Sequence, residues 1–127
     1  MEDFTVLEKI GQGNFGVVYL VYSRRDPGYS VIKQINLRNL SSAEKGNVFQ
    51  ETQLLSSLKH PSIVQYKESF QENGFINIVM EHCAGGDLYT LINRRRGVYF
   101  QESLILNFFA QICSAVLFIH KSLETSE

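Results

Sequence analysis

Cysteine and proline are scarce in this chain of 127 residues, which contains two of each and no tryptophan. The two cysteines, Cys83 and Cys113, are too few to form a disulfide framework, and this favours a reducing compartment such as the cytosol or nucleus. The three histidines lack the spacing of zinc ligands, so we expect no metal site. No apolar run approaches the roughly 18 to 20 residues of a membrane span, and the N-terminus does not resemble a secretory signal.

A strong excess of charge of either sign is also missing. The formal net charge is −1, which gives no electrostatic case for nucleic acid or an anionic membrane as the main partner. The composition is 44% hydrophobic and 20% charged, as in ordinary soluble domains. The length is enough for one compact domain with its own core.

The pattern of apolar residues predicts five strands and three helices. Strands are expected over residues 4–12, 17–22, 29–37, 63–70 and 75–81, and helices over 41–58, 88–95 and 101–121. Ser41 and Glu44 form a capping-box pattern at the first helix, and Asn73-Gly74 indicates a tight turn between the last two strands. The predicted fold class is α+β, with a sheet unit over residues 1–84 and a helical unit that begins in residues 85–127.

A glycine-rich stretch, IGQGNFGVVYLVY, begins at Ile10 and places glycines at positions 11, 13 and 16. This spacing occurs in dinucleotide-binding folds, but there a helix starts at the third glycine and an acidic residue follows about 20 positions later. Here a β-branched and aromatic strand follows, and Lys33 occupies that later region. A glycine-rich hairpin whose N–H groups face phosphate oxygens fits better, with an ordinary turn as the alternative.

Two charged residues stand at positions where apolar residues are expected. Lys33 shares a strand face with Val31 and Ile35, and Glu51 lies on an otherwise apolar helix face. Because a buried ion needs a partner, the two are predicted to pair beneath the glycine hairpin, where Lys33 can reach phosphates. The alternatives are that Lys33 extends to solvent from the sheet and that Glu51 is a surface charge at the edge of the apolar stripe. The pair and the hairpin together predict a nucleotide triphosphate site.

Several motifs, in the right order, resemble the N-terminal half of a eukaryotic protein kinase domain. GQGNFGVV matches the glycine-rich loop G-x-G-x-x-G-x-V, SVIK matches the V-A-I-K strand at Lys33, and Glu51 matches the helix glutamate. LKHPSIVQYKESFQENG and IVMEHCAGGDLYTLINRRRGVYFQESLILNFFAQI resemble the NIMA-related (Nek) subfamily of serine/threonine kinases in particular. The resemblance covers residues 4–121. It implies a kinase N-lobe, with a five-stranded antiparallel sheet and one helix, followed by the first two helices of a truncated C-lobe.

The resemblance also implies a role for each residue of an ATP site. Gly11, Gly13 and Gly16 would cover the phosphates, Lys33 would contact the α- and β-phosphates, and Glu51 would orient Lys33. Ile10 and Val18 would pack on the adenine, and Met80 would gate the back of the pocket. Glu81 and Cys83 would offer backbone hydrogen bonds to adenine, and Asp87 would lie near the ribose. Val31 is the remaining site residue and belongs to the V-A-I-K strand.

The printed sequence stops before the motifs that complete catalysis. His120 is followed by KSLETSE, so these residues include neither the H-R-D aspartate nor the asparagine and D-F-G aspartate that hold magnesium. We therefore expect ATP as the ligand, magnesium only for the complete family domain, and no catalytic residue or kinase activity from this chain alone. The alternatives are a non-catalytic truncated isoform that acts as an interaction or dominant-negative module, and a non-functional product of aberrant splicing or gene prediction.

Two surface features complete these expectations. The helix expected over residues 101–121 is apolar on nearly all sides, so much of it should be exposed here, as a partner surface or an aggregation hazard. Arg94–Arg96 is interpreted as a solvated helix end, with a patch for an acidic partner as the alternative.

Protein substrates or regulatory proteins are the expected partners. The expected location is cytoplasmic, with the nucleus and the cytoskeleton as alternatives that the resemblance suggests.

Overall fold

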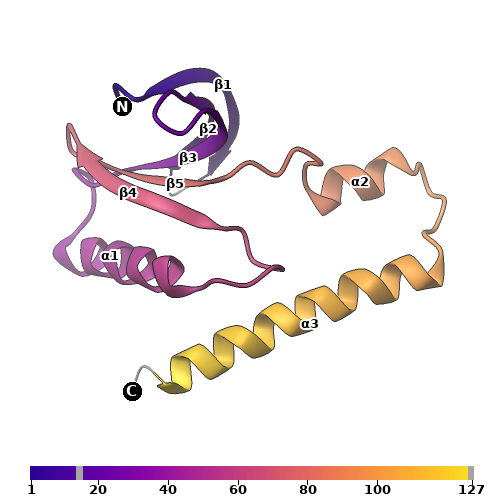
Figure 1. The fold of residues 1–127 in the computed structure, drawn as a ribbon. Helices are drawn as coiled ribbons and strands as arrows, with labels where there is room; N and C mark the ends of the chain where they lie inside the picture. Colours follow the sequence, from indigo (N-terminus) through magenta and orange to yellow (C-terminus); the bar gives the residue numbers. More distant parts are fainter. Residues whose placement is uncertain (14–15, 126–127) are drawn as a thin grey trace. The chain divides into compact units, whose positions relative to one another are not determined.

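The structure is a computed structural model, and it describes residues 1–13 and 16–125. The chain divides into two units, one of residues Met1–Lys59 and Val64–His82 and the other of His60–Ile63 and Cys83–Glu127. The elements follow the predicted order of three strands, a helix, two strands and two helices (Figure 1). Their bounds are β1 Phe4–Gly13, β2 Gly16–Ser23, β3 Gly28–Asn36, α1 Ser42–Ser57, β4 Tyr66–Glu72, β5 Phe75–Glu81, α2 Leu88–Arg94 and α3 Glu102–Thr125.

The five strands of the first unit form one antiparallel sheet in the order β1-β2-β3-β5-β4 (Figure 1). α1 lies in the chain between β3 and β4, and this longer connection lets β4 take the edge beyond β5. The register places Lys33 of β3 opposite Val18 of β2 and Ile78 of β5. Because directly opposed residues of antiparallel strands share a face, these three side chains lie on one side of the sheet.

The sheet buries apolar side chains on both faces. On one face Val21, Ile32 and Val79 are at most 1% exposed, and Phe4 and Phe70 pack against them with their rings stacked 6.2 Å apart. Ile32 lies on this face and Lys33, the next residue of the strand, lies on the other, so this layer buries the apolar side chain of Ile32. The opposite face carries a second cluster, made of Ile35, Leu37, Ile76 and Ile78 with Leu40, Val48, Tyr66 and Met80 packed against it.

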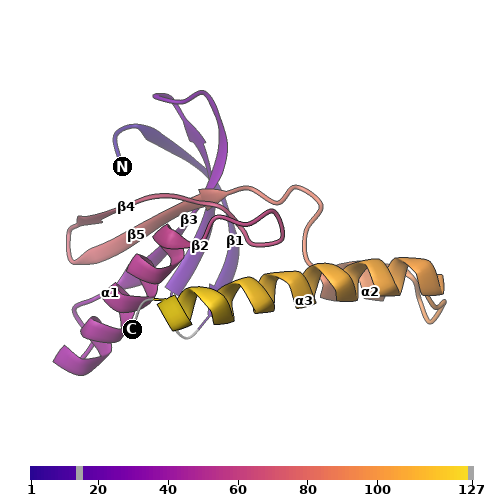
Figure 2. The same ribbon diagram turned by 60° about the horizontal axis from the view of Figure 1, so that its bottom comes forward.

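α1 begins with the capping box that the sequence predicts. The N–H of Glu44 donates to Ser41 Oγ over 3.2 Å, and the N–H of Ser41 donates to Glu44 Oε2 over 2.9 Å. The helix contacts β4 and lies on one face of the sheet (Figure 2). Its inner side carries Val48 and the buried Thr52, whose hydroxyl donates to the carbonyl oxygen of Val48 over 2.8 Å.

β4 begins at Tyr66, later than the predicted strand start at residue 63. The preceding residues form a tight turn, in which the N–H of Ile63 donates to the carbonyl oxygen of His60 over 3.1 Å. The His60 imidazole accepts a hydrogen bond from the N–H of Ser62 at 3.0 Å and lies 3.1 Å from Ser114 Oγ of α3. The prediction that this strand starts at residue 63 is therefore wrong, because residues 60–63 form a turn that makes contacts within the second unit.

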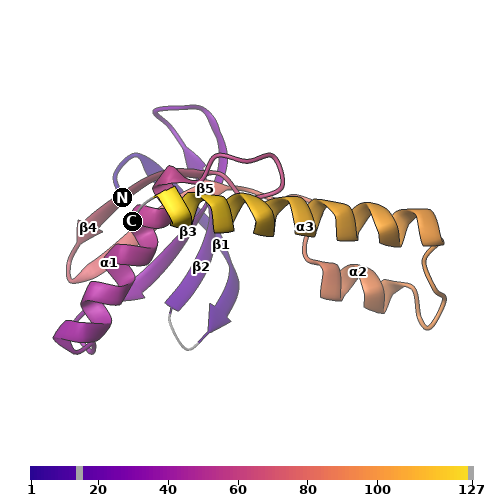
Figure 3. The ribbon, with the colours of Figure 1, turned by 90° about the horizontal axis from the view of Figure 1, so that it is seen from below.

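The second unit contains α2 and α3, and the connection between them reverses the direction of the chain (Figures 1 and 3). The predicted exposure of the long helix is confirmed. Seven large apolar side chains of α3 are at least 43% exposed, namely Ile105, Leu106, Phe109, Ile112, Val116, Leu117 and Leu123.

Residues Glu102–Glu124 of α3 are long and apolar enough to cross a membrane by length and composition alone. Core helices of soluble proteins meet the same requirement, so this property by itself assigns no membrane role. The expectation that the chain has no such segment is nevertheless wrong. Polar residues are scattered along this helix, so it contains no long continuous apolar run, although its hydropathy averaged over the whole helix is high.

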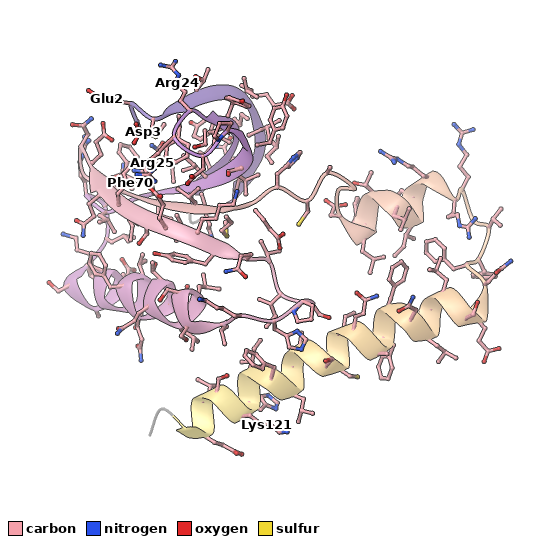
Figure 4. The ribbon with its side chains drawn as sticks, viewed as in Figure 1. Glu2, Asp3, Arg24, Arg25, Phe70 and Lys121 are labelled. Atoms are coloured by element: carbon pink, nitrogen blue, oxygen red, sulfur yellow. The ribbon has the colours of Figure 1, made fainter. Side chains whose placement is uncertain are left out.

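Arg24 and Arg25, in the turn between β2 and β3, make polar contacts at one corner of the sheet (Figure 4). Arg25 Nη1 lies 3.8 Å from Asp3 Oδ2, and Arg25 Nη2 pairs with Glu68 of β4. Arg24 donates to Thr5 Oγ1 over 3.0 Å from Nη2 and 3.2 Å from Nε. Exposed ion pairs contribute at most about 1 kcal/mol each, so these contacts add little to the stability of the sheet.

Candidate nucleotide site

Lys33 lies in the middle of β3, on the sheet face that α1 covers. Its neighbours two positions away on the strand, Val31 and Ile35, are 8% and 7% exposed, whereas Lys33 is half-buried. An ammonium group among apolar side chains must reach solvent or a polar group, because leaving it unsolvated is costly. The structure thus places Lys33 on the face that the strand alternation predicts.

A cavity of about 810 Å³ lies beside Lys33. Its size falls within the range of about 300 to 1,000 Å³ that is usual for small-molecule sites. It combines the glycine hairpin, Lys33 and Glu51. The described residues that line it are Gln12, Gly13, Gly16, Val17, Lys33, Gln34, Ile35, Asn36, Asn39, Leu40, Glu44, Asn47, Val48, Glu51 and Phe75. The hairpin tip between Gly13 and Gly16, which belongs to the predicted phosphate loop, lies outside the described residues.

Glu51 lines this cavity, but it does not point into the core as predicted. Its side chain is exposed, and the adjacent Thr52 is buried instead. Because a helix repeats every 3.6 residues, Val48, Thr52 and Leu55 form the inner stripe and Glu51 flanks it as a surface charge. Among the residues that the structure describes, Lys33 forms no ion pair with Glu51, so the predicted pair is absent from this structure.

The glycines of the hairpin have different surroundings. A Cβ atom on Gly16 would overlap the carbonyl oxygen of Gln34 in β3. A Cβ atom on Gly13 would meet no atom within 4 Å, and one on Gly11 would make ordinary contact with Val18 at 3.6 Å. Gly16 is therefore needed for the packing of β2 against β3, whereas Gly13 leaves space at the wall of the cavity.

Three further predicted site residues, Val18, Val31 and Met80, are close neighbours of Lys33 in the sheet, and Ile10 lies in β1. Val31 is paired with Met80 of β5, and Val18 is paired with Lys33 itself. Val18 and Met80 are half-buried, and Ile10, at an irregularity of β1, is 46% exposed. The described lining of the cavity includes none of these four residues, so their predicted roles stay predictions.

Glu81, the last residue of β5, is held by Gln65. The N–H of Glu81 donates to the carbonyl oxygen of Gln65 over 2.9 Å, and the Glu81 carboxylate accepts the N–H of Gln65 over 2.8 Å. The N–H and the carboxylate of Glu81 are therefore both engaged within the first unit. The predicted hydrogen bond from its backbone to adenine stays a prediction.

Cys83 and Asp87 belong to the second unit and precede α2. The carbonyl oxygen of Cys83 accepts the N–H of Gly86 over 3.1 Å, and its thiol is free and exposed. Asp87 is the N-cap of α2, with Oδ1 accepting the N–H of Thr90 over 2.7 Å. Hydrogen bonds from the side chain and then the backbone of Thr90 lower the pKa of the Asp87 carboxyl. The structure shows a capping role for Asp87, and its predicted ribose contact stays a prediction.

The sequence patterns that predict the site do not include several amide side chains around the cavity. Asn47 lies one helical turn before Glu51 and lines the same cavity, and this spacing could have identified it. Gln34 Nε2 donates to Oδ1 of the fully buried Asn77 over 3.1 Å. No local signal points to that pair, because Asn77 stands as a single polar residue inside an apolar strand.

The cavity residues fit a polyphosphate better than a divalent cation. Lys33 supplies a positive charge and the hairpin supplies open backbone, and both suit phosphate oxygens. In the part of the lining that the structure describes, the carboxylates are those of Glu44 and Glu51, and Glu44 belongs to the capping box of α1. Across the described residues, no group of three or more His, Cys, Asp or Glu side chains could hold a metal ion.

The protein kinase domain family matches this chain over residues 4–123, from the start of β1 almost to the end of α3. The chain belongs to the protein kinase family. It is similar to serine/threonine-protein kinase Nek1 of Mus musculus (48% identical over 120 residues), Nek5 of Homo sapiens (47% over 120) and Nek4 of Mus musculus (44% over 119). The alignments cover 94%, 94% and 93% of this chain, but only 10%, 17% and 15% of those proteins.

The family match accounts for the fold and for the apolar helix α3. The predicted N-lobe sheet with its helix, followed by helices of a C-lobe, is confirmed, as is the resemblance to Nek-type serine/threonine kinases. The match includes almost the whole of α3, so this kinase helix is part of the domain itself. The chain spans less than a fifth of each of these three relatives.

Proposed function

We propose that this kinase chain binds the phosphates of ATP in the cavity beside Lys33. The observation that carries the proposal is a half-buried lysine on the wall of a cavity that also contacts Gly13 and Gly16. Among the residues that the structure describes, Lys33 is the one cation in that lining, and a triphosphate carries several negative charges. Partial burial strengthens their attraction, because the effective dielectric constant near a protein surface is well below that of water.

The glycine hairpin supplies the second part of this proposal. Backbone N–H groups can approach phosphate oxygens closely only where no Cβ atom intervenes, and the space beside Gly13 is open. The adenine would lie along the apolar side chains of Val18, Val31 and Met80, which share the sheet face of Lys33. The chain's own residues would thus hold the phosphates by charge and the base by apolar contact.

Transfer of the phosphoryl group to a protein serine or threonine needs residues that this chain does not contain. In kinases the catalytic-loop aspartate accepts the proton of the substrate hydroxyl, and an asparagine and the D-F-G aspartate hold magnesium. Neither an H-R-D nor a D-F-G motif occurs in the sequence. We assign nucleotide binding to residues 4–123 and assign magnesium use and phosphoryl transfer to the complete kinase domain.

A time course with labelled ATP and a generic protein substrate tests this division of roles. The 127-residue chain is expected to give no turnover above the blank reaction. Lys33→Met serves as the control, because it removes the charge that the cavity offers to the phosphates. Turnover by the wild type that disappears in Lys33→Met would contradict this division of roles, because the chain would then carry out the transfer by itself.

A further inference from the structure

The turn that follows α2 combines three cations with exposed apolar side chains. Between Asp87 and Glu102 the sequence contains three arginines and no lysine or acidic residue, although the net charge of the chain is −1. Among the described residues, Arg94–Arg96 have no carboxylate partner. Val98 and Tyr99, which follow them closely, are 64% and 93% exposed.

Arg96 adopts a backbone conformation that arginine seldom takes. α2 ends with Arg95 as its C-cap, and Arg96 follows with φ of 49°. Glycine or asparagine usually occupies this left-handed position after a helix, because other side chains are strained there. The N–H of Arg96 still donates to the carbonyl oxygen of Asn93 over 3.2 Å, so the conformation belongs to the helix end. The turn therefore carries an arginine where the fold itself favours a smaller residue.

Arg95 has a different role from the arginines on either side of it. Its guanidinium carbon lies 4.6 Å from the centre of the Phe100 ring, a cation–π contact. The Phe100 ring in turn meets Phe108 of α3 edge to face, with centroids 6.1 Å apart. These contacts anchor the turn on α3 and leave Arg94 and Arg96 as its exposed cations.

We propose that Arg94, Arg96, Val98 and Tyr99 form a docking surface for an acidic segment of a partner protein. Arginine binds carboxylates through charge-assisted hydrogen bonds, and arginine and tyrosine are enriched among the residues that dominate interface energy. Val98 and Tyr99 expose apolar surface, so the partner's segment should carry an apolar or aromatic side chain beside its acidic ones. The basic surface is one short turn with two exposed arginines, fewer cations than the many phosphate contacts of nucleic acid need, which favours an acidic peptide.

Fluorescence anisotropy tests the proposal, with the full chain and a labelled peptide in which aspartates and glutamates flank one phenylalanine. The Arg94→Glu, Arg96→Glu double variant is expected to raise the Kd about tenfold or more, because two attractive charges become repulsive. Raising the salt concentration from about 50 to about 300 mM should also weaken binding by the wild type. Lys59→Glu is the matched control, because it reverses an exposed charge outside the turn. Unchanged affinity of the double variant, or an equal loss in Lys59→Glu, would overturn the proposal.

The Arg96→Asn variant tests whether peptide binding can be changed without loss of folding stability. Asparagine tolerates the left-handed conformation, so the Tm should stay the same or rise while the Kd for the peptide increases. An unchanged Kd in this variant would overturn the role of Arg96. A peptide without phenylalanine is expected to bind less tightly than the parent peptide. Tighter binding of a single-stranded DNA oligonucleotide than of the acidic peptide would assign the turn to nucleic acid and overturn the proposal.

Discussion

Gly16 of β2 lies so close to Gln34 of β3 that no side chain fits between the two strands at this point. A Cβ atom on Gly16 would overlap the Gln34 carbonyl oxygen and lie 3.1 Å from the carbonyl carbon. The third glycine of the kinase hairpin is therefore required by the packing of the sheet, whether or not a phosphate is bound. The open surroundings of Gly13 allow stability and nucleotide binding to be tested separately.

Alanine substitutions at the two glycines should affect stability to different degrees. Gly16→Ala forces β2 away from β3 and should lower the free energy of unfolding by about 1 to 3 kcal/mol, as overpacking does. Gly13→Ala meets no neighbouring atom and should change it by less than about 1 kcal/mol. Urea unfolding followed by circular dichroism measures both values. Equal destabilisation by the two substitutions would contradict the close packing of Gly16.

Glu51→Gln should leave stability almost unchanged. The carboxylate is exposed and forms no ion pair with Lys33 among the described residues, so its removal should alter the free energy of unfolding by no more than about 0.5 kcal/mol. The same urea titration provides the measurement. A loss of about 3 kcal/mol or more is typical of breaking a buried pair. Such a loss would show that Glu51 and Lys33 pair in solution.

α2 should lose its N-terminal cap in acid. The pKa of Asp87 in the folded chain lies below its ordinary value of 3.8 because of hydrogen bonds from Thr90, so folding favours the charged form. The resulting stabilisation is complete above that ordinary value and is lost as the pH falls through the lower folded value. NMR chemical shifts of Thr90 and Leu91 between about pH 6 and pH 2 should report the loss. Asp87→Asn keeps a capping oxygen without titrating, so an identical transition in that variant would contradict the assignment.

The exposed apolar surface of α3 should bind a hydrophobic dye. Leu106 and Phe109 are 56% and 63% exposed, so replacing both with glutamine should reduce the fluorescence of bound anilinonaphthalene sulfonate. Leu7→Gln is the control, because Leu7 is also exposed, at 48%, but lies in β1 and not in α3. An unchanged dye signal in the α3 variant would contradict the prediction.

Local signals in the sequence were sufficient to predict the order and type of the elements. The capping box at Ser41 and the Asn73-Gly74 turn are read from adjacent residues, and both form as predicted, with positive φ at Asn73 and Gly74. The glycine hairpin and Lys33 were also found from spacing and strand alternation, and the structure gathers them at one cavity.

Features that depend on tertiary packing could not be predicted in the same way. Helical spacing allows either Glu51 or Thr52 to complete the inner stripe of α1. Thr52 takes that place because its hydroxyl bonds the carbonyl oxygen of Val48, which lowers the cost of burial. The buried amide of Asn77 depends on Gln34, 43 positions earlier in the chain, and no local pattern connects them.

Nucleotide titration followed by NMR tests most directly whether ATP binds beside Lys33. The wild-type chain, Lys33→Met and Lys59→Met would each be titrated with ATP, with and without magnesium. Lys59 is an exposed lysine outside the cavity lining, so its substitution controls for the loss of one positive charge. We predict weak binding that magnesium does not change, that Lys33→Met abolishes and that Lys59→Met retains. Tight magnesium-dependent binding, or equal affinity in Lys33→Met and the wild type, would contradict this account of ATP binding beside Lys33.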